Sequence, residues 1–180
     1  MTDPQRCSLG SAPGPDARKP GDRVPDVSFR LRRGADWVET STGRIFDGRN
    51  VIVFSLPGAF TPTCSAKHVP GYVAQFDALR GAGVDEIWCL SVNDAFVMGA
   101  WARDQKTAGK VRMLGDGSAA FTQAVGLPLD LTANGMGVRS QRYSMLVVDG
   151  VVRTLNIEAP GKFEVSDADT MLTQAKALKG

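Results

Sequence analysis

The chain has 180 residues, of which 43% are apolar and 22% charged, as in an ordinary soluble globular protein. Lysine and arginine number 21 against 19 aspartates and glutamates, and a net charge of +2 predicts no affinity for nucleic acid or anionic membranes. No apolar run approaches the roughly 20 residues that span a bilayer. A chain of this length is expected to form a stable buried core without disulfide bonds.

The N-terminal stretch differs in composition from the rest of the chain. It is rich in proline, glycine, serine and charge, and it lacks the apolar core of a secretory signal. We expect residues 1–18 to be a flexible tail and residues 19–180 to form one domain. A cytoplasmic location is the expectation. An organellar import segment is poorly supported, because the stretch contains Asp3 and Asp16 and no amphipathic run.

Strands and helices alternate after this tail. A continuous apolar run at 51–56 is typical of a strand buried on both faces. Apolar residues then recur at helical spacing until two glycines end the pattern. The expected elements are strands at 51–56, 86–92, 111–114, 144–148 and 151–155, and helices at about 69–80, 95–107, 119–125 and 166–178.

Local signals support three of these boundaries. Asn93 and Asp94 can cap the helix that follows them, and Asp149-Gly150 suits a tight hairpin turn. Ser166, with Asp169 three residues later, resembles a capping box. A β-α-β-α-β beginning, a hairpin and a terminal helix predict an α/β thioredoxin-like fold, with a central mixed sheet flanked by helices.

The segment at 57–68 carries the most specific chemical signal. It joins the apolar strand to the next helix, at the end of an α/β sheet where ligands bind. Cys64 is expected in the first turn of that helix, where free N–H groups and the helix dipole favour a thiolate. A buried inert cysteine would need neither this junction nor the upstream Thr61. The pattern therefore predicts a reactive thiol.

Two other residue types complete the expected site. Thr61 lies about one helical turn before Cys64, so its hydroxyl can reach the same side. When a thiolate attacks a peroxide, negative charge builds on the departing oxygen. An arginine would offer that oxygen several hydrogen-bond donors in a rigid arrangement. The candidates are Arg139 and Arg142, just before the strand at 144–148.

Pro57, Thr61 and Cys64 match the Pro-x-x-x-Thr-x-x-Cys motif of peroxiredoxins. The strings at 57–72 and 135–147 resemble the peroxiredoxin-5 branch, also called type II or atypical peroxiredoxins. In that branch the active-site arginine directly precedes an aromatic residue, which selects Arg142 over Arg139. The resemblance extends from about residue 19 to residue 179.

This resemblance implies a thioredoxin fold and a thiol-dependent peroxidase that acts on hydrogen peroxide and alkyl hydroperoxides. Cys64 would be the nucleophile and would cycle through sulfenic acid. Thr61 and Arg142 would orient and polarise the peroxide, and Pro57 would shield the pocket from water. No metal, haem or flavin is implied, and the expected assembly is a homodimer packed around the active-site ends of its monomers.

The other two cysteines are not obvious resolving thiols. An odd, low cysteine count is typical of a reducing compartment. Cys89 is mid-strand and is expected to be buried and inert, and Cys7 in the tail lacks a recognisable context. Some members of the branch carry a resolving cysteine near the last helix, where 161–166 offers only serine. An external thiol is therefore expected: glutathione, with or without glutaredoxin, or thioredoxin.

Several alternatives remain open at this point. His68, the only histidine, shares a helix face with Cys64, and a packing or positioning role is favoured over a metal or protease site. The three tryptophans are expected to be structural, and Phe60 and Phe121 are more typical of a core than of a pocket. A peroxide sensor or binding module with low turnover is the alternative function. A disulfide exchanger is disfavoured because Cys-x-x-Cys is missing.

Overall fold

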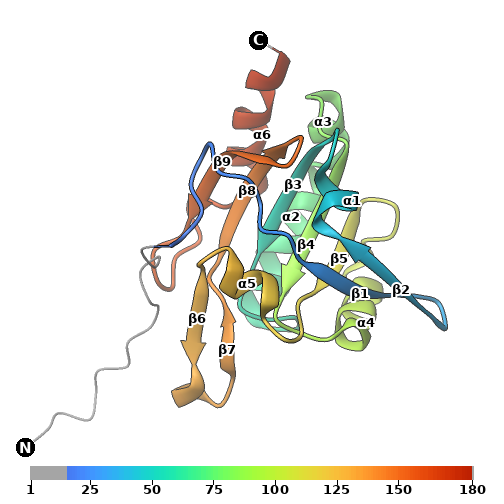
Figure 1. Ribbon diagram of the computed structural model, residues 1–180, viewed down its shortest axis with the longest axis vertical. Helices are drawn as coiled ribbons and strands as arrows, with labels where there is room; N and C mark the ends of the chain where they lie inside the picture. Colours follow the sequence, from blue (N-terminus) through green and yellow to red (C-terminus); the bar gives the residue numbers. More distant parts are fainter. Residues whose placement is uncertain (1–15, 180) are drawn as a thin grey trace, which may run out of the picture.

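A computed structural model describes residues 16–179. Its centre is a five-stranded mixed sheet in the order β5-β4-β3-β8-β9, with two further two-stranded sheets, β1-β2 and β6-β7 (Figure 1). In chain order the strands and helices are β1 (Ser28–Arg33), β2 (Asp36–Ser41), α1 (Thr42–Phe46), β3 (Asn50–Ser55), the π-helix η1 (Cys64–His68), α2 (Val69–Ala74), α3 (Phe76–Gly81), β4 (Glu86–Ser91), α4 (Ala95–Gln105), β5 (Val111–Gly115), α5 (Ala120–Ala124), β6 (Pro128–Leu131), β7 (Gly137–Ser140), β8 (Tyr143–Val148), β9 (Val151–Ile157) and α6 (Ala168–Lys176). Short 3₁₀ turns follow β6 and α6. The predicted α/β thioredoxin-like architecture, a mixed sheet flanked by helices, is confirmed.

The central strand β3 is buried on both faces. It pairs in parallel with β4 and antiparallel with β8. Because successive side chains of a strand point to opposite faces, Ile52 and Phe54 join one apolar cluster and Val51 and Val53 the other. The first cluster includes residues of α2, α3, α4 and α6, and the second includes residues of β1, α1 and α5. This double cover explains the continuous apolar run in the sequence.

Most predicted elements are confirmed to within a few residues. The hairpin turn between β8 and β9 has φ values of 47° at Asp149 and 76° at Gly150, the positive values that a tight turn requires. Gly48 donates its backbone N–H to the Asp149 carboxylate across 2.7 Å, which ties the turn to the start of β3. The helix expected at 69–80 is divided at Gln75, so that α2 and α3 are separate segments.

The proposed capping box at the last helix is wrong by one residue. Asp167 is the N-cap of α6 and accepts the backbone N–H of Thr170 across 3.1 Å. Ser166 instead donates its hydroxyl to Glu158. At α4 the cap is Asp94, and the Asn93 side chain accepts the N–H of Ala59 from the loop before Cys64. Asn93 and Ser166, which are not the helix caps, therefore hold loops at the active-site end through their side chains.

The sequence did not predict three parts of the fold: the β1-β2 hairpin, α1 and the β6-β7 hairpin. The β6-β7 hairpin extends away from the sheet just before Arg142 (Figure 1). Within residues 16–179, no helix is long and apolar enough to cross a bilayer. The boundary expected at residue 18 stays a prediction, because residues 1–15 lie outside the described part of the chain.

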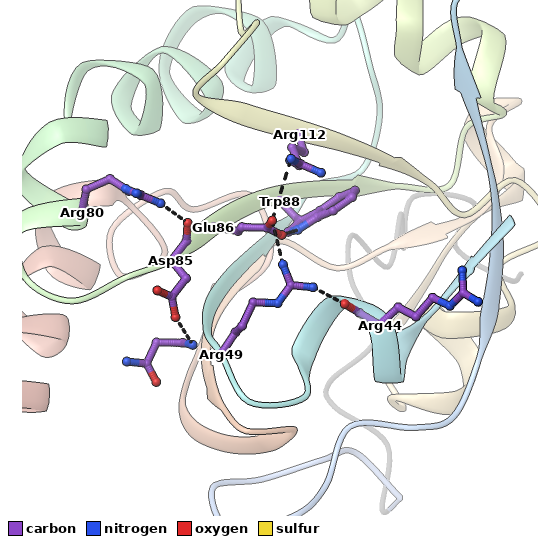
Figure 2. A network of polar contacts seen from close by, with 8 residues as sticks. Arg44, Arg49, Arg80, Asp85, Glu86, Trp88 and Arg112 are labelled. Atoms are coloured by element: carbon purple, nitrogen blue, oxygen red, sulfur yellow. Dashed lines mark hydrogen bonds and ion pairs between the residues drawn. The ribbon is translucent and has the colours of Figure 1, made fainter. Parts of the chain in front are cut away.

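A polar network fixes the opposite end of the sheet, at the start of β3 and β4 (Figure 2). The Glu86 carboxylate accepts a hydrogen bond from Arg49 across 2.8 Å and one from the Trp88 indole across 2.9 Å. Asp85 accepts the backbone N–H of Asn50 across 2.8 Å. These contacts set the register of β3 against β4, and the register in turn determines where the loop after β3 begins.

Candidate functional site

Cys64 lies where the connection after β3 turns into a helix. The backbone is helical from Pro62, whose missing N–H costs little at a helix start, and Ser65 donates its N–H to the Thr61 carbonyl across 3.0 Å. Cys64 begins the π-helical turn, in which Val69 donates to the Cys64 carbonyl. Such turns are rare and are frequently found at functional sites. The Cys64 side chain is fully buried.

Arg142 reaches Cys64 from the segment between β7 and β8. One terminal nitrogen of its guanidinium donates to the Cys64 sulfur across 3.2 Å. Arg139, the other candidate, contacts backbone instead, donating to the carbonyls of Met136 across 2.9 Å and Pro57 across 3.4 Å. The fold thus brings Arg142 to the thiol and uses Arg139 to hold the loop that carries Pro57.

His68 holds the other side of the Arg142 guanidinium. Its Nδ1 lies 2.9 Å from the second terminal nitrogen of Arg142, and its Nε2 lies 3.1 Å from the Ser166 carbonyl. An arginine can only donate and a carbonyl can only accept, so we assign the proton of the neutral ring to Nε2. Burial and then the charge of Arg142 lower the pKa of His68 to about 3. His68 is therefore a neutral positioning residue.

Aromatic rings surround this imidazole. Its centroid lies 4.8 Å from that of Phe54, 5.0 Å from that of Phe163 and 5.8 Å from that of Tyr72. Tyr72 stacks on Phe54 and donates its hydroxyl to the same Ser166 carbonyl across 2.9 Å. This packing keeps water from the ring and fixes its orientation.

Glu158 is a part of the site that sequence reasoning missed. Its carboxylate accepts the backbone N–H groups of Glu164, Val165 and Ser166 at 2.8–3.1 Å and the Ser166 hydroxyl at 2.8 Å. Its own N–H donates to the Arg142 carbonyl across 3.0 Å. Burial raises the pKa of Glu158, but the backbone and hydroxyl donors outweigh that effect and leave the pKa below its usual value. One ionised carboxylate thus connects the backbone of Arg142 to the loop that orients His68.

Thr61 and Pro57 lie near the thiol without a hydrogen bond to it. The Thr61 hydroxyl donates to the Gly58 carbonyl across 2.6 Å, which leaves its lone pairs available to accept from another group. Pro57 lines a pocket of about 460 Å³, together with Thr63 and Arg142. A Cβ at Gly58 would lie 3.1 Å from Arg139 Nη1 and from Thr61 Cγ2, so both side chains would have to shift by a few tenths of an ångström.

Cys89 has the buried position that the sequence predicts. It is fully enclosed within β4, and burial, then the nearby Cys64, raises the pKa of its thiol well above the usual value. Such a thiol is a poor nucleophile. Cys7 lies outside the described residues. No cluster of three or more His, Cys, Asp or Glu side chains suited to a metal occurs in residues 16–179.

The aromatic residues divide differently from expectation. Phe121 is in the core, as are Trp88 and Trp101. Trp37 is not, since it is 50% exposed and packs edge-to-face on the exposed Phe96. Phe60 is also exposed, with a positive φ of 62° in the loop before Cys64. The expectation of a core position is therefore wrong for Phe60, whereas Trp37 has a structural contact at the surface.

Several known proteins are similar in sequence to this chain. The family profile described as Redoxin matches residues 19–172. Peroxiredoxin-2B of Arabidopsis thaliana is 46% identical over 153 residues, covering 84% of this chain and 94% of that protein. This chain belongs to the redoxin family and is a peroxiredoxin of the peroxiredoxin-5 type.

Two further relatives agree with that assignment. Hybrid peroxiredoxin hyPrx5 of Haemophilus influenzae is 50% identical over 155 residues, and the match covers 84% of this chain but only 64% of that longer protein. Reduced Prx3 of Vibrio vulnificus, solved in complex with hydrogen peroxide, is 46% identical with a TM-score of 0.84. That alignment covers 88% of this chain and 99% of the Vibrio chain. The similarity therefore includes the whole sheet and the Cys64 segment.

His68 should make the stability of this peroxiredoxin depend on pH. The folded-state pKa of His68 is about 3, against 6.5 for a free imidazole. Below about pH 6.5 the unfolded state therefore binds one more proton than the folded state, and stability falls as pH falls. Between about pH 6.5 and 5 we expect the free energy of unfolding to drop with a slope that approaches about 1.4 kcal/mol per pH unit.

Urea unfolding at several pH values measures this slope. Since His68 is the only histidine, the His68→Gln variant should lose the dependence in that window while keeping a side chain that can hydrogen bond. Carboxylates titrate in both proteins and cancel in the difference. Equal slopes for the wild type and the variant would contradict the neutral assignment.

Proposed function

We propose that this peroxiredoxin reduces hydrogen peroxide and alkyl hydroperoxides with the Cys64 thiolate. The observation that carries the proposal is the 3.2 Å contact between the Arg142 guanidinium and the Cys64 sulfur at a helix start. The guanidinium fixes the position of the sulfur through this hydrogen bond. The same cation can stabilise the negative charge that builds on the leaving oxygen.

The reaction follows from this arrangement. The sulfur attacks one peroxide oxygen, an S–O bond forms and the O–O bond breaks. The departing oxygen takes a proton and leaves as water or an alcohol, and Cys64 becomes a sulfenic acid. Pro57 shields this space. Thr61 holds the peroxide, because its hydroxyl already donates to Gly58 and is free to accept the peroxide proton.

An external thiol completes the cycle in this proposal. Cys89 is enclosed and weakly acidic, and the 161–166 loop offers Ser166 with its hydroxyl bound to Glu158. The Cys89 thiol is too deeply buried to reach the sulfenic acid, and the 161–166 loop contains no thiol. We propose glutathione, with or without glutaredoxin, as the reductant, and thioredoxin is the alternative.

The Cys64→Ser variant tests the proposed reaction. It should lose all detectable peroxide consumption with dithiothreitol, glutathione, glutaredoxin plus glutathione, or thioredoxin, because serine cannot form a sulfenic acid. The matched control, Cys89→Ala, should retain turnover within about twofold, since its thiol does not react. Activity in Cys64→Ser would sink the assignment. Stoichiometric oxidation of wild-type Cys64 without turnover in any donor would instead indicate a peroxide sensor.

Thr61 should matter through its hydroxyl and not through its shape. Replacement by valine keeps the volume and removes the acceptor, so the second-order rate of Cys64 oxidation should fall roughly a hundredfold. Thr61→Ser keeps the hydroxyl and should stay within about tenfold of the wild type. Stopped-flow fluorescence with hydrogen peroxide measures both rates. Equal rates for the valine and serine variants would remove Thr61 from the mechanism.

We also propose a homodimer that packs at the active-site end. Phe60, Phe96 and Trp37 are 53%, 58% and 50% exposed, and the Arg32 guanidinium lies 5.1 Å and 4.9 Å from the ring centroids of Trp37 and Phe96. The Asn93–Ala59 bond places the Phe60 loop beside the start of α4. Clusters of exposed apolar side chains mark interfaces, and two-fold dimers are the commonest assembly.

A charge at the centre of this cluster should weaken the dimer. Phe96→Glu would remove an apolar ring and place a hydrated carboxylate in the interface, so we expect the dissociation constant measured by sedimentation velocity to rise about tenfold or more. Val138→Glu is the control, because Val138 is an exposed apolar residue on β7, outside the cluster. A monomeric wild type would overturn the dimer. An unchanged constant in Phe96→Glu would overturn its location.

A further inference from the structure

A pocket of about 390 Å³ lies at the β5 edge of the central sheet. Its lining comes from β1, β2, α4 and β5, which gather on one side of the molecule, and from Trp88 of β4 (Figure 1). It shares no lining residue with the pocket at Arg142. The volume is within the range of sites for small organic ligands, so a molecule could bind here without entering the peroxide site.

Most of this lining is apolar. Helix α4 contributes Ala95, Met98, Gly99 and Ala102, which recur at the spacing of one helix face. Three of these four residues are alanine or glycine, and they leave space between α4 and the β1-β2 hairpin. Met98 and Trp88 are buried, and the other apolar side chains of the lining are partly buried: Leu31, Val38 and Met113. Methionine adapts its shape readily, which suits contact with a flexible chain.

The charged residues of the lining are all arginines. They are Arg32, Arg33 and Arg112, and no aspartate or glutamate lines the pocket. Arg32 packs on the cluster of Trp37 and Phe96, so it contributes positive charge at the rim. Arg33 is exposed and has no salt bridge within residues 16–179. The pocket therefore combines apolar walls with an excess of positive charge.

Glu86 competes only weakly for Arg112. The two side chains lie 3.8 Å apart, but the Glu86 carboxylate already accepts hydrogen bonds from Arg49 across 2.8 Å and from Trp88 across 2.9 Å (Figure 2). The Arg112 side chain is 61% exposed, and ion pairs at such positions contribute little. Its guanidinium lies 5.5 Å from the centroid of the Trp88 ring. A cation is thus held at the edge of the apolar lining, where a bound anion can reach it.

We propose that this pocket binds an amphipathic acid, which has a carboxylate head and an alkyl chain. The head pairs with Arg33 and Arg112, because a guanidinium offers a carboxylate two parallel hydrogen bonds. The chain lies against Trp88, Met98 and the small residues of α4, where it is removed from water. The proposal does not depend on the peroxidase reaction, since Cys64 is not part of this lining.

Titration calorimetry with decanoate tests the head and the chain together. Decanoate should bind saturably to the full-length protein. Butanoate has the same head with a shorter chain, and decyltrimethylammonium has the same chain with a positive head, so both should bind at least about tenfold more weakly. The absence of saturable decanoate binding would overturn the site. Equal affinity for decyltrimethylammonium would indicate nonspecific apolar contact and would also overturn it.

Two variants test the head and the chain separately. Arg33→Gln/Arg112→Gln should raise the decanoate dissociation constant about tenfold or more. Its matched control, Arg153→Gln/Lys176→Gln, makes the same change of net charge at exposed positions outside the pocket and should keep the wild-type constant. Ala102→Phe keeps every arginine and fills the space beside α4, so it should also weaken binding about tenfold. Equal effects of the two charge variants, or unchanged binding in both pocket variants, would contradict the proposal.

Nuclear magnetic resonance locates the ligand within the protein. The indole N–H resonance of Trp88 should shift saturably with decanoate. The indole of Trp101, which donates to Ser65 across 3.1 Å and does not line the pocket, should shift much less. Cys64→Ser should bind decanoate as the wild type does, whether or not the peroxidase proposal holds. Loss of binding in Cys64→Ser would instead place decanoate at the peroxide site and overturn the pocket at β5.

Discussion

The contact of Arg142 with both Cys64 and a neutral His68 is the interaction on which the rest of the site depends. The guanidinium has a hydrogen-bond acceptor on each terminal nitrogen, and neither bond involves a carboxylate. A carboxylate in place of His68 would hold the arginine equally well but would neutralise its charge. A neutral imidazole fixes the geometry and leaves the positive charge directed at the sulfur and at the pocket beyond it.

The neutrality of His68 depends on residues far away in the sequence. Phe54 comes from the central strand and Phe163 from the last long loop, and together they desolvate the ring. The Ser166 carbonyl accepts a hydrogen bond from the Nε2–H of His68. Glu158 in turn holds the backbone of the loop that carries Ser166 through its hydrogen bonds. The end of β9 therefore controls the charge state of a residue one helical turn after Cys64.

The sequence predicts Cys64 and Arg142 better than it predicts the residues that hold them in place. The buried strands could be predicted because they are continuous apolar runs. Cys64 and Arg142 could be predicted because they occur in recognisable sequence motifs. Glu158 accepts mainly backbone N–H groups, which leave no residue pattern, and Ser166 satisfies a capping pattern that Asp167 fulfils. The β1-β2 hairpin was missed because neither strand contains a continuous apolar run and β2 lacks a polar and apolar alternation.

The same contacts argue for a reductant from outside the chain. A resolving thiol within the 161–166 loop would have to move that loop away from Glu158 to reach Cys64, and the move would withdraw the Ser166 carbonyl from His68. Reduction would then disrupt the support of Arg142 in every cycle. The external thiol proposed as the reductant would leave the Glu158 hydrogen bonds in place. The arrangement that positions Arg142 on the sulfur thus favours a mobile second thiol.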